Sequence, residues 1–164
     1  MRYLTLLSLV FCLVATSVQA QKALPNVTVS TLTGKKKSIK DFVKKDKITV
    51  ISFWATWCKP CKLELDNLAE LYADWQDDYD VEIIAITIDT ERALRRVKPL
   101  VKTKGWEYRI LSDKNRDLHK ALGFQDVPAT IVVDKNQNVV YTHSGYKLGD
   151  EEDLEDHIKE IAGE

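Results

Sequence analysis

The chain has 164 residues and a formal net charge of −1 at pH 7, with 45% hydrophobic and 30% charged residues. This size and composition suffice for the hydrophobic core of one ordinary domain, and no internal repeat or low-complexity linker interrupts the chain. The near balance of charge argues against nucleic acid as a partner, because nucleic-acid-binding proteins carry an excess of Lys and Arg.

Residues 1–20 have the pattern of a secretory signal peptide. Arg2 supplies a basic start, residues 4–15 are apolar, and residues 17–20 offer the small side chains that a signal peptidase reads. The apolar run is shorter than the roughly 20 residues of a membrane span. Because short anchors overlap with it in length, a retained anchor is the alternative. We expect cleavage after Ala20, export to the periplasm of a bacterial source, and one domain over residues 21–164.

Cleavage after Ala20 would also decide the cysteine content of the mature chain. It removes Cys12 and leaves Cys58 and Cys61. Exported scaffolds that depend on disulfides for stability carry several pairs, so a single pair at this spacing is more typical of a redox motif.

The first half of the domain begins with alternating apolar and polar residues at 26–33, followed by a turn at Gly34. We expect a hairpin there and then a short helical turn capped by Ser38. Residues 48–54 form an apolar run that predicts the first core strand. The helix that follows from Lys59 has one apolar face, made of Cys61, Leu65, Leu68, Tyr72 and Trp75.

The second half alternates strands and helices. Residues 81–88 predict a strand buried on both faces. The next helix is expected to be capped by Thr90 and to start late or kink at Pro99. The remaining predicted elements are a strand at 108–111, a helix at 118–122, a hairpin of strands 130–133 and 139–142, and a terminal helix with Leu154, Ile158 and Ile161 inside. This order predicts an α/β sandwich with a mixed sheet.

Cys58 and Cys61 stand where the first core strand passes into the helix. The amino terminus of a helix favours a thiolate at Cys58, and Pro60 fits a first helical turn. Cys61, one turn further, would then be the less exposed, resolving thiol. A structural disulfide and half of a zinc site are the alternatives. Zinc takes four ligands, and the other candidates, His119, His143 and His157, are dispersed along the chain.

Residues 53–62, Phe-Trp-Ala-Thr-Trp-Cys-Lys-Pro-Cys-Lys, resemble the active-site segment of the thioredoxin superfamily. Residues 38–42 and the expected export resemble its TlpA/ResA branch of extracytoplasmic thiol–disulfide oxidoreductases. The resemblance covers nearly all of residues 24–161. It implies a thioredoxin-like three-layer sandwich, a mixed β-sheet flanked by helices, with an N-terminal β-hairpin extension.

The resemblance also implies which residues face a bound partner. A cis peptide bond before Pro128 would face the cysteines, and the backbone of Val127 would pair with a bound peptide. Trp57, Lys59 and Pro60, beside Cys58, are the other candidate binding residues. Without the resemblance, Pro128 is a strand-initiating proline.

An acid is expected to handle the proton of the resolving cysteine. Glu64 corresponds to an active-site acid of the TlpA/ResA branch and could carry the proton of Cys61. Its alternative is a solvated helix glutamate. Thioredoxins proper have a buried acid where this chain has Ser52, which makes Glu64 the nearest candidate. Asp66 stands where the branch often has a proline.

These observations predict a protein-disulfide oxidoreductase that reduces client proteins through Cys58 and Cys61, with no cofactor beyond that redox-active disulfide and no metal. The resemblance implies an upstream membrane-bound thiol–disulfide electron donor, and we expect a monomer. A peroxiredoxin-like peroxide reductase is one alternative, although Ala55 stands where that chemistry wants a threonine and no proline lies between Asn26 and Trp57. A copper-handling module using Cys58, Cys61 and His143 is another.

Overall fold

The structure, a computed structural model, describes residues 22–163. The proposed signal peptide and Cys12 lie outside the described residues. Within residues 22–163 no helix is both long enough and apolar enough to cross a membrane.

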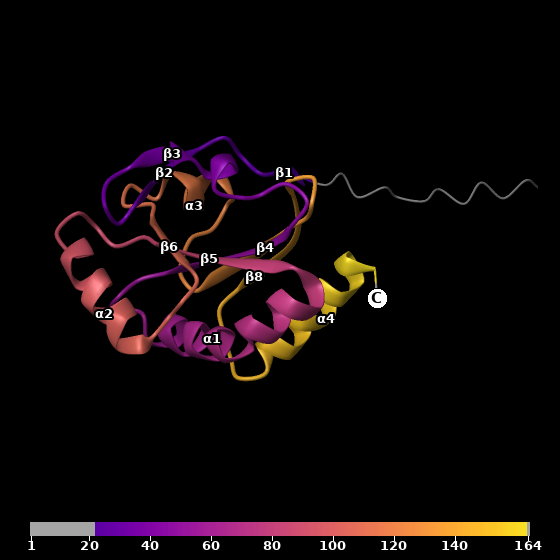
Figure 1. Cartoon of the computed structure of the whole chain (residues 1–164). Coiled ribbons are helices and arrows are strands. Elements are labelled where there is room, and N and C mark those ends of the chain that lie inside the picture. The colour runs from indigo at the N-terminus through magenta and orange to yellow at the C-terminus, as the bar shows by residue number, and fades with distance from the viewer. Residues whose placement is uncertain (1–21, 164) are drawn as a thin grey trace, which may run out of the picture.

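A mixed sheet forms the middle layer of the domain (Figure 1). Across residues 22–163 its strand order is β1-β8-β7-β4-β5-β6-β2-β3. The strands are β1 (Lys22–Ala23), β2 (Thr28–Thr31), β3 (Lys36–Ser38), β4 (Ile48–Trp54), β5 (Val81–Thr87), β6 (Arg109–Ser112), β7 (Ala129–Val133) and β8 (Asn138–Ser144). β4 is parallel to β5 and antiparallel to β7.

The two central strands form the core because their sequences are almost wholly β-branched or apolar. Every residue of β4 and β5 is buried, as expected for strands covered on both faces. The N-terminal hairpin of β2 and β3 extends the sheet, since β2 pairs antiparallel with β6. The three-layer sandwich with an N-terminal hairpin is therefore confirmed.

Helices cover both faces of this sheet. They are α1 (Lys59–Tyr79), α2 (Val97–Lys104), α3 (Asp117–Ala121) and α4 (Asp150–Ala162), with 3-10 turns η1 (Ile39–Asp41) and η2 (Leu94–Arg96). Figure 1 shows α1, α2 and α4 on one side of the sheet and α3 on the other. The predicted inner face of α1 is confirmed: Cys61, Leu65, Leu68 and Trp75 are buried and Tyr72 is half-buried.

The caps differ in how well they were predicted. The Ser38 hydroxyl accepts a hydrogen bond from the Lys40 N–H at 3.2 Å, so the predicted cap of η1 is confirmed. The predicted cap at Thr90 is wrong. Its carbonyl accepts from the N–H groups of Ala93 and Leu94, which forms a tight turn, and α2 begins only at Val97 without a side-chain cap. This late start places Pro99 in the first turn, where its missing N–H leaves no helical hydrogen bond unmade.

Trp106 makes two contacts that fix the packing around the start of α1. Trp54 is fully buried and its ring meets that of Trp106 edge-on at 5.1 Å between centroids. Asp66 accepts a hydrogen bond from Trp106 Nε1 at 3.0 Å and pairs with Lys104. The residue that replaces the branch's proline therefore ties α1 to α2.

Candidate functional site

Cys58 and Cys61 form a disulfide at the start of α1, with 5.4 Å between their Cα atoms. Cys58 is the N-cap residue, and its Sγ accepts a hydrogen bond from the Cys61 N–H at 3.2 Å. Cys58 retains 4% of its surface exposed, whereas Cys61 retains none. Because the unpaired N–H groups and dipole of α1 point at Cys58, charge that develops on its sulfur is stabilised there.

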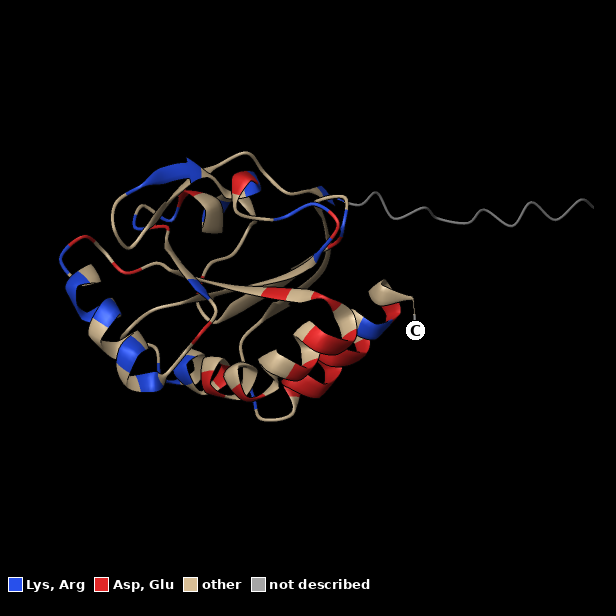
Figure 2. Cartoon of the chain, viewed as in Figure 1, with Lys and Arg blue, Asp and Glu red and all other residues tan. Residues whose placement is uncertain are grey.

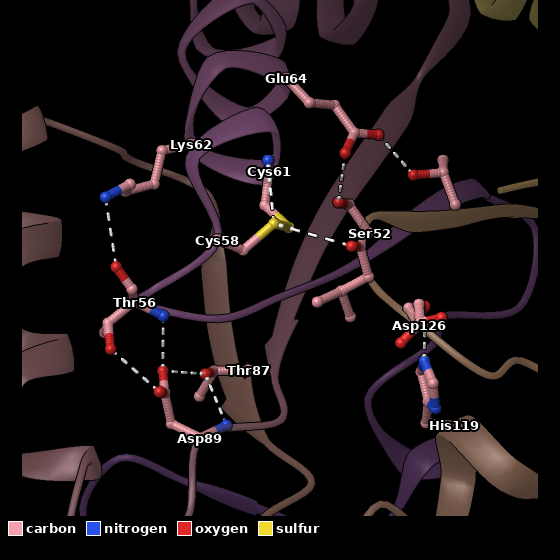
Figure 3. The surroundings of a disulfide bond; sticks show 12 residues. Ser52, Thr56, Cys58, Cys61, Lys62, Glu64, Thr87, Asp89, His119 and Asp126 are labelled. Carbon is pink, nitrogen blue, oxygen red and sulfur yellow. Dashed lines mark hydrogen bonds between the residues drawn. A yellow bond between two sulfur atoms is a disulfide. The ribbon is translucent and has the colours of Figure 1, made fainter. Parts of the chain in front are cut away.

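A buried carboxylate holds the loop that presents Cys58 (Figure 3). Asp89 accepts hydrogen bonds from the Thr56 N–H at 2.8 Å, the Thr56 hydroxyl at 2.9 Å and the Thr87 hydroxyl at 2.7 Å. The Lys62 ammonium donates to the Thr56 carbonyl at 3.2 Å. Sequence reasoning missed Asp89. Its signal was its position, since it follows β5, whose carboxyl end lies beside that of the parallel strand β4.

The loop before β7 forms the opposite wall of the site. The Val127–Pro128 peptide bond is cis, as expected, and the Val127 carbonyl oxygen lies 3.8 Å from Cys58 Sγ. Throughout residues 22–163 the Val127 N–H meets no hydrogen-bond acceptor. The N–H of Val127 is therefore free to pair with a bound peptide, and Pro128 carries the cis bond and directly precedes β7.

His119 supports this wall from the face of the sheet that α3 covers. It is fully buried, its Nε2–H donates to the Asp126 carbonyl at 3.0 Å, and its ring meets that of Phe53 edge-on. Burial lowers the pKa of His119, so the ring is neutral near pH 7. Sequence reasoning considered His119 only as a dispersed zinc candidate. Its link to the cis-proline loop depends on a contact seven residues away that no pattern signals.

Glu64 lies one turn after Cys61 on α1, with its carboxyl group directed toward Ser52 (Figure 3). It is buried, with 4% of its surface exposed, so its reading as a solvated helix glutamate is wrong. The Thr130 hydroxyl donates to its Oε1 and the Ser52 hydroxyl to its Oε2, at 2.5 and 3.3 Å. Ser52 and Thr130 are register partners on β4 and β7, which places both hydroxyls under α1.

The pKa of Glu64 is raised to about 7, because loss of solvation outweighs the two hydrogen bonds that favour the carboxylate. Asp150 and Glu151 raise it further. A carboxyl group that is half ionised near neutral pH can both accept and return a proton. Its position next to Cys61 on α1 suits the predicted role of proton carrier.

The structure also shows where the exposed binding candidates beside Cys58 and the proposed copper ligand His143 lie. Trp57 is 68% exposed, and Lys59 and Pro60 are exposed beside it. His143 on β8 contacts Asp150, with 3.1 Å between Nε2 and Oδ2. In the described part of the chain no three His, Cys, Asp or Glu side chains gather into a metal-binding group, so His143 does not join the two cysteines in one.

Three comparisons place this site among known proteins. The AhpC/TSA family model matches residues 20–142. The chain is 35% identical over 140 residues to the thiol–disulfide oxidoreductase ResA of Bacillus thuringiensis, which covers 85% of this chain and 77% of ResA.

Solved structures agree with this relationship. An uncharacterized thioredoxin-like protein from Porphyromonas gingivalis is 40% identical with a TM-score of 0.76, covering 87% of this chain and 94% of that one. A thioredoxin-family thiol:disulfide interchange protein from Chlorobium tepidum, 24% identical, shares the fold with a TM-score of 0.68 over 87% of this chain and 97% of its own. The chain therefore belongs to the AhpC/TSA family of thioredoxin-like proteins, with ResA-type thiol–disulfide oxidoreductases among its relatives.

Proposed function

We propose that this thiol–disulfide oxidoreductase is exported and reduces disulfides of extracytoplasmic client proteins. The observation that supports this most directly is the placement of Cys58 between the α1 amino terminus and the free backbone of Val127. The sequence pattern of residues 1–20 supports export. The relationship to ResA supports the reaction class.

The reaction begins with the reduced dithiol. The Cys58 thiolate attacks one sulfur of the client disulfide, and the second client sulfur leaves as a thiolate, which produces a mixed disulfide. The client segment pairs with the Val127 backbone while Trp57 packs against it. Cys61 then attacks Cys58 Sγ, which releases the client as a dithiol and closes the disulfide seen in the structure.

Glu64 takes the proton of Cys61 as that thiol becomes the attacking thiolate. A pKa of about 7 makes the carboxylate a competent base near neutral pH. Returning the enzyme to its reduced form takes two electrons and two protons. We propose that a membrane-bound thiol–disulfide donor supplies the electrons and that Glu64 returns one proton to Cys61.

Equilibration of the purified protein with glutathione tests the direction of electron flow. A reductase has a reduction potential well below that of strong oxidants such as DsbA, about −120 mV. A potential near that value would overturn the reductase assignment. Peroxide turnover that disappears in Cys58→Ser would instead support the peroxiredoxin-like alternative.

Trapping in cells tests the clients. The Cys61→Ser variant lacks the resolving thiol and should accumulate mixed disulfides through Cys58, whereas the Cys58→Ser/Cys61→Ser double variant should accumulate none. Absence of mixed disulfides from Cys61→Ser would contradict the exchange reaction. Recovery of the trapped species from a periplasmic fraction, and not from the cytoplasm, would support export.

A further inference from the structure

The exposed surface beside the disulfide carries a group of unpaired cations. Arg92, Arg95, Arg96 and Lys98, here called the α2 basic surface, are all exposed at the start of α2. Over residues 22–163 none of the four forms an ion pair, and the nearby Glu91 pairs with Lys114 instead. Figure 2 shows Lys and Arg gathered on α2, whereas Asp and Glu gather on α4 and the adjoining part of α1.

The chain path connects this surface to the loop that presents Cys58. Asp89 holds Thr56, two residues before Cys58. Arg92 follows Asp89 by three residues, so their Cα atoms are at most about 11 Å apart. Lys59 is exposed beside Cys58 itself. A partner segment that extends several residues beyond a disulfide held at Cys58 is therefore long enough to reach Arg92.

Arg95 and Arg96, the last residues of η2, lie at the amino terminus of α2, where positive charge is unfavourable for that helix. The amino terminus of a helix carries partial positive charge and favours acidic side chains by about 0.3–1 kcal/mol each. Here Arg95 and Arg96 directly precede Val97, and the first turn of α2 contains no acidic residue. Acidic residues would stabilise α2 better at this place, so the stability of α2 does not account for these two arginines.

The surface is also hollowed in a way that suits an extended segment. One shallow groove is lined by Thr90, Arg92, Arg95 and Arg96. A second groove continues from Arg95 and Lys98 toward Lys36 and Lys114 on the hairpin side. The charged residues of this lining are basic apart from Glu91, which pairs with Lys114, and the others are uncharged.

We propose that the α2 basic surface is a docking site for clients whose disulfide is flanked by an acidic segment. This inference rests on the proposed function and adds a substrate preference to it. Unpaired cations beside the reactive group attract an acidic partner and raise its association rate. The acidic α4 repels the same partner, so the two charged surfaces orient it with its disulfide toward Cys58.

Two synthetic peptides test the preference, each with one intramolecular disulfide, flanked by four glutamates in one peptide and by four lysines in the other. The second-order rate constant for oxidation of the reduced protein should be at least tenfold higher with the acidic peptide at low salt. The difference should shrink as NaCl screens the charges, since the Debye length falls to about 8 Å at 0.15 M ionic strength.

The Arg95→Glu/Arg96→Glu variant should abolish or reverse this preference. Because it places acids at a helix amino terminus, it should unfold at the same or higher denaturant concentration than the unaltered protein. Lys45→Glu/Lys135→Glu is the matched control. It makes the same change of charge at two exposed positions, just before the start of β4 and just after the end of β7. These antiparallel strand ends lie together, away from the end of β4 that leads to Cys58, so the variant should keep the preference.

The outcomes separate this inference from the proposed function. Equal rates for both peptides, or a preference that survives in Arg95→Glu/Arg96→Glu, would overturn the docking site while leaving thiol–disulfide exchange intact. Failure to reduce even 2,2′-dithiodipyridine, a small disulfide that is uncharged at neutral pH, would overturn both. Equal peptide rates, combined with sedimentation on anionic phosphatidylglycerol vesicles that the variant loses, would assign the surface to a membrane instead.

Discussion

Thr130 on β7 donates its hydroxyl to the Glu64 carboxylate on α1, across 66 positions of sequence. Thr130 is buried, so this contact places a hydroxyl group in the core beneath the first turns of α1. Together with Ser52 it provides the polar contacts of a carboxyl group whose pKa is raised to about 7. The stability and the reactivity of this protein are therefore linked through the same side chain.

Glu64→Gln should make the protein less sensitive to alkaline pH. The pKa of Glu64 rises from 4.5 in the unfolded chain to about 7 when folded, so the folded state loses stability as pH rises through this range. A shift of this size corresponds to about 3 kcal/mol. The unfolding free energy of the oxidised variant, relative to the unaltered protein, should rise by about that amount between pH 4 and pH 8. Urea denaturation at both pH values measures it. A constant difference would contradict the raised pKa.

Thr130→Val should raise the pKa of Glu64 above 7. The substitution removes the hydroxyl that favours the carboxylate and keeps the shape of the side chain. A ¹³C NMR titration of the labelled carboxyl carbon measures the pKa directly. Thr142→Val, at an exposed position on the neighbouring strand β8, is the control and should leave the titration unchanged.

Asp89→Asn should both destabilise the protein and slow client reduction. The substitution replaces one carboxylate oxygen with an NH₂ group, which cannot accept a hydrogen bond. At least one of the hydrogen bonds from Thr56 or Thr87 is therefore lost. Leaving such a group unsatisfied costs about 1–3 kcal/mol. Denaturant unfolding and peptide reduction rates measure the two effects. Glu91→Gln, whose exposed ion pair contributes little, should change neither stability nor rate by a comparable amount.

His119→Leu should remove part of the acid sensitivity of the fold. Burial lowers the pKa of His119 in the folded protein. Below about pH 6.5 the imidazole is protonated in the unfolded chain, whereas in the folded chain it is protonated only at lower pH, so acid favours unfolding. The unaltered protein should therefore lose stability relative to the variant between pH 7.5 and pH 5. His157→Leu alters an exposed histidine on α4 and serves as the control. An identical pH dependence in all three proteins would show that His119 does not titrate differently on folding.

The same His119 variant should weaken the wall that faces Cys58. Its loss leaves the Asp126 carbonyl without its donor, next to the Val127–Pro128 bond. We expect slower reduction of client peptides with little change for Ellman's reagent, because the small reagent needs no backbone pairing. An equal loss for both substrates would indicate a disturbed disulfide site instead.

Local patterns in the sequence determined most of the elements and the reactive pair. The bounds of β4, the inner face of α1, the Ser38 cap and the cysteine spacing are properties of a few neighbouring residues, which periodicity and capping rules describe. The resemblance supplied the cis bond before Pro128. The late start of α2 was only half predicted, since Pro99 indicated it while Thr90 indicated the wrong cap.

Only the tertiary structure decided what surrounds the two cysteines. Asp89 reaches Thr56 because β4 and β5 are parallel neighbours. Ser52 and Thr130 can both bind Glu64 because the register of β4 and β7 places them side by side. The contact of His119 with Asp126 likewise depends on how the elements pack. Burial and long-range register set these contacts, and neither is a property of a short stretch of sequence.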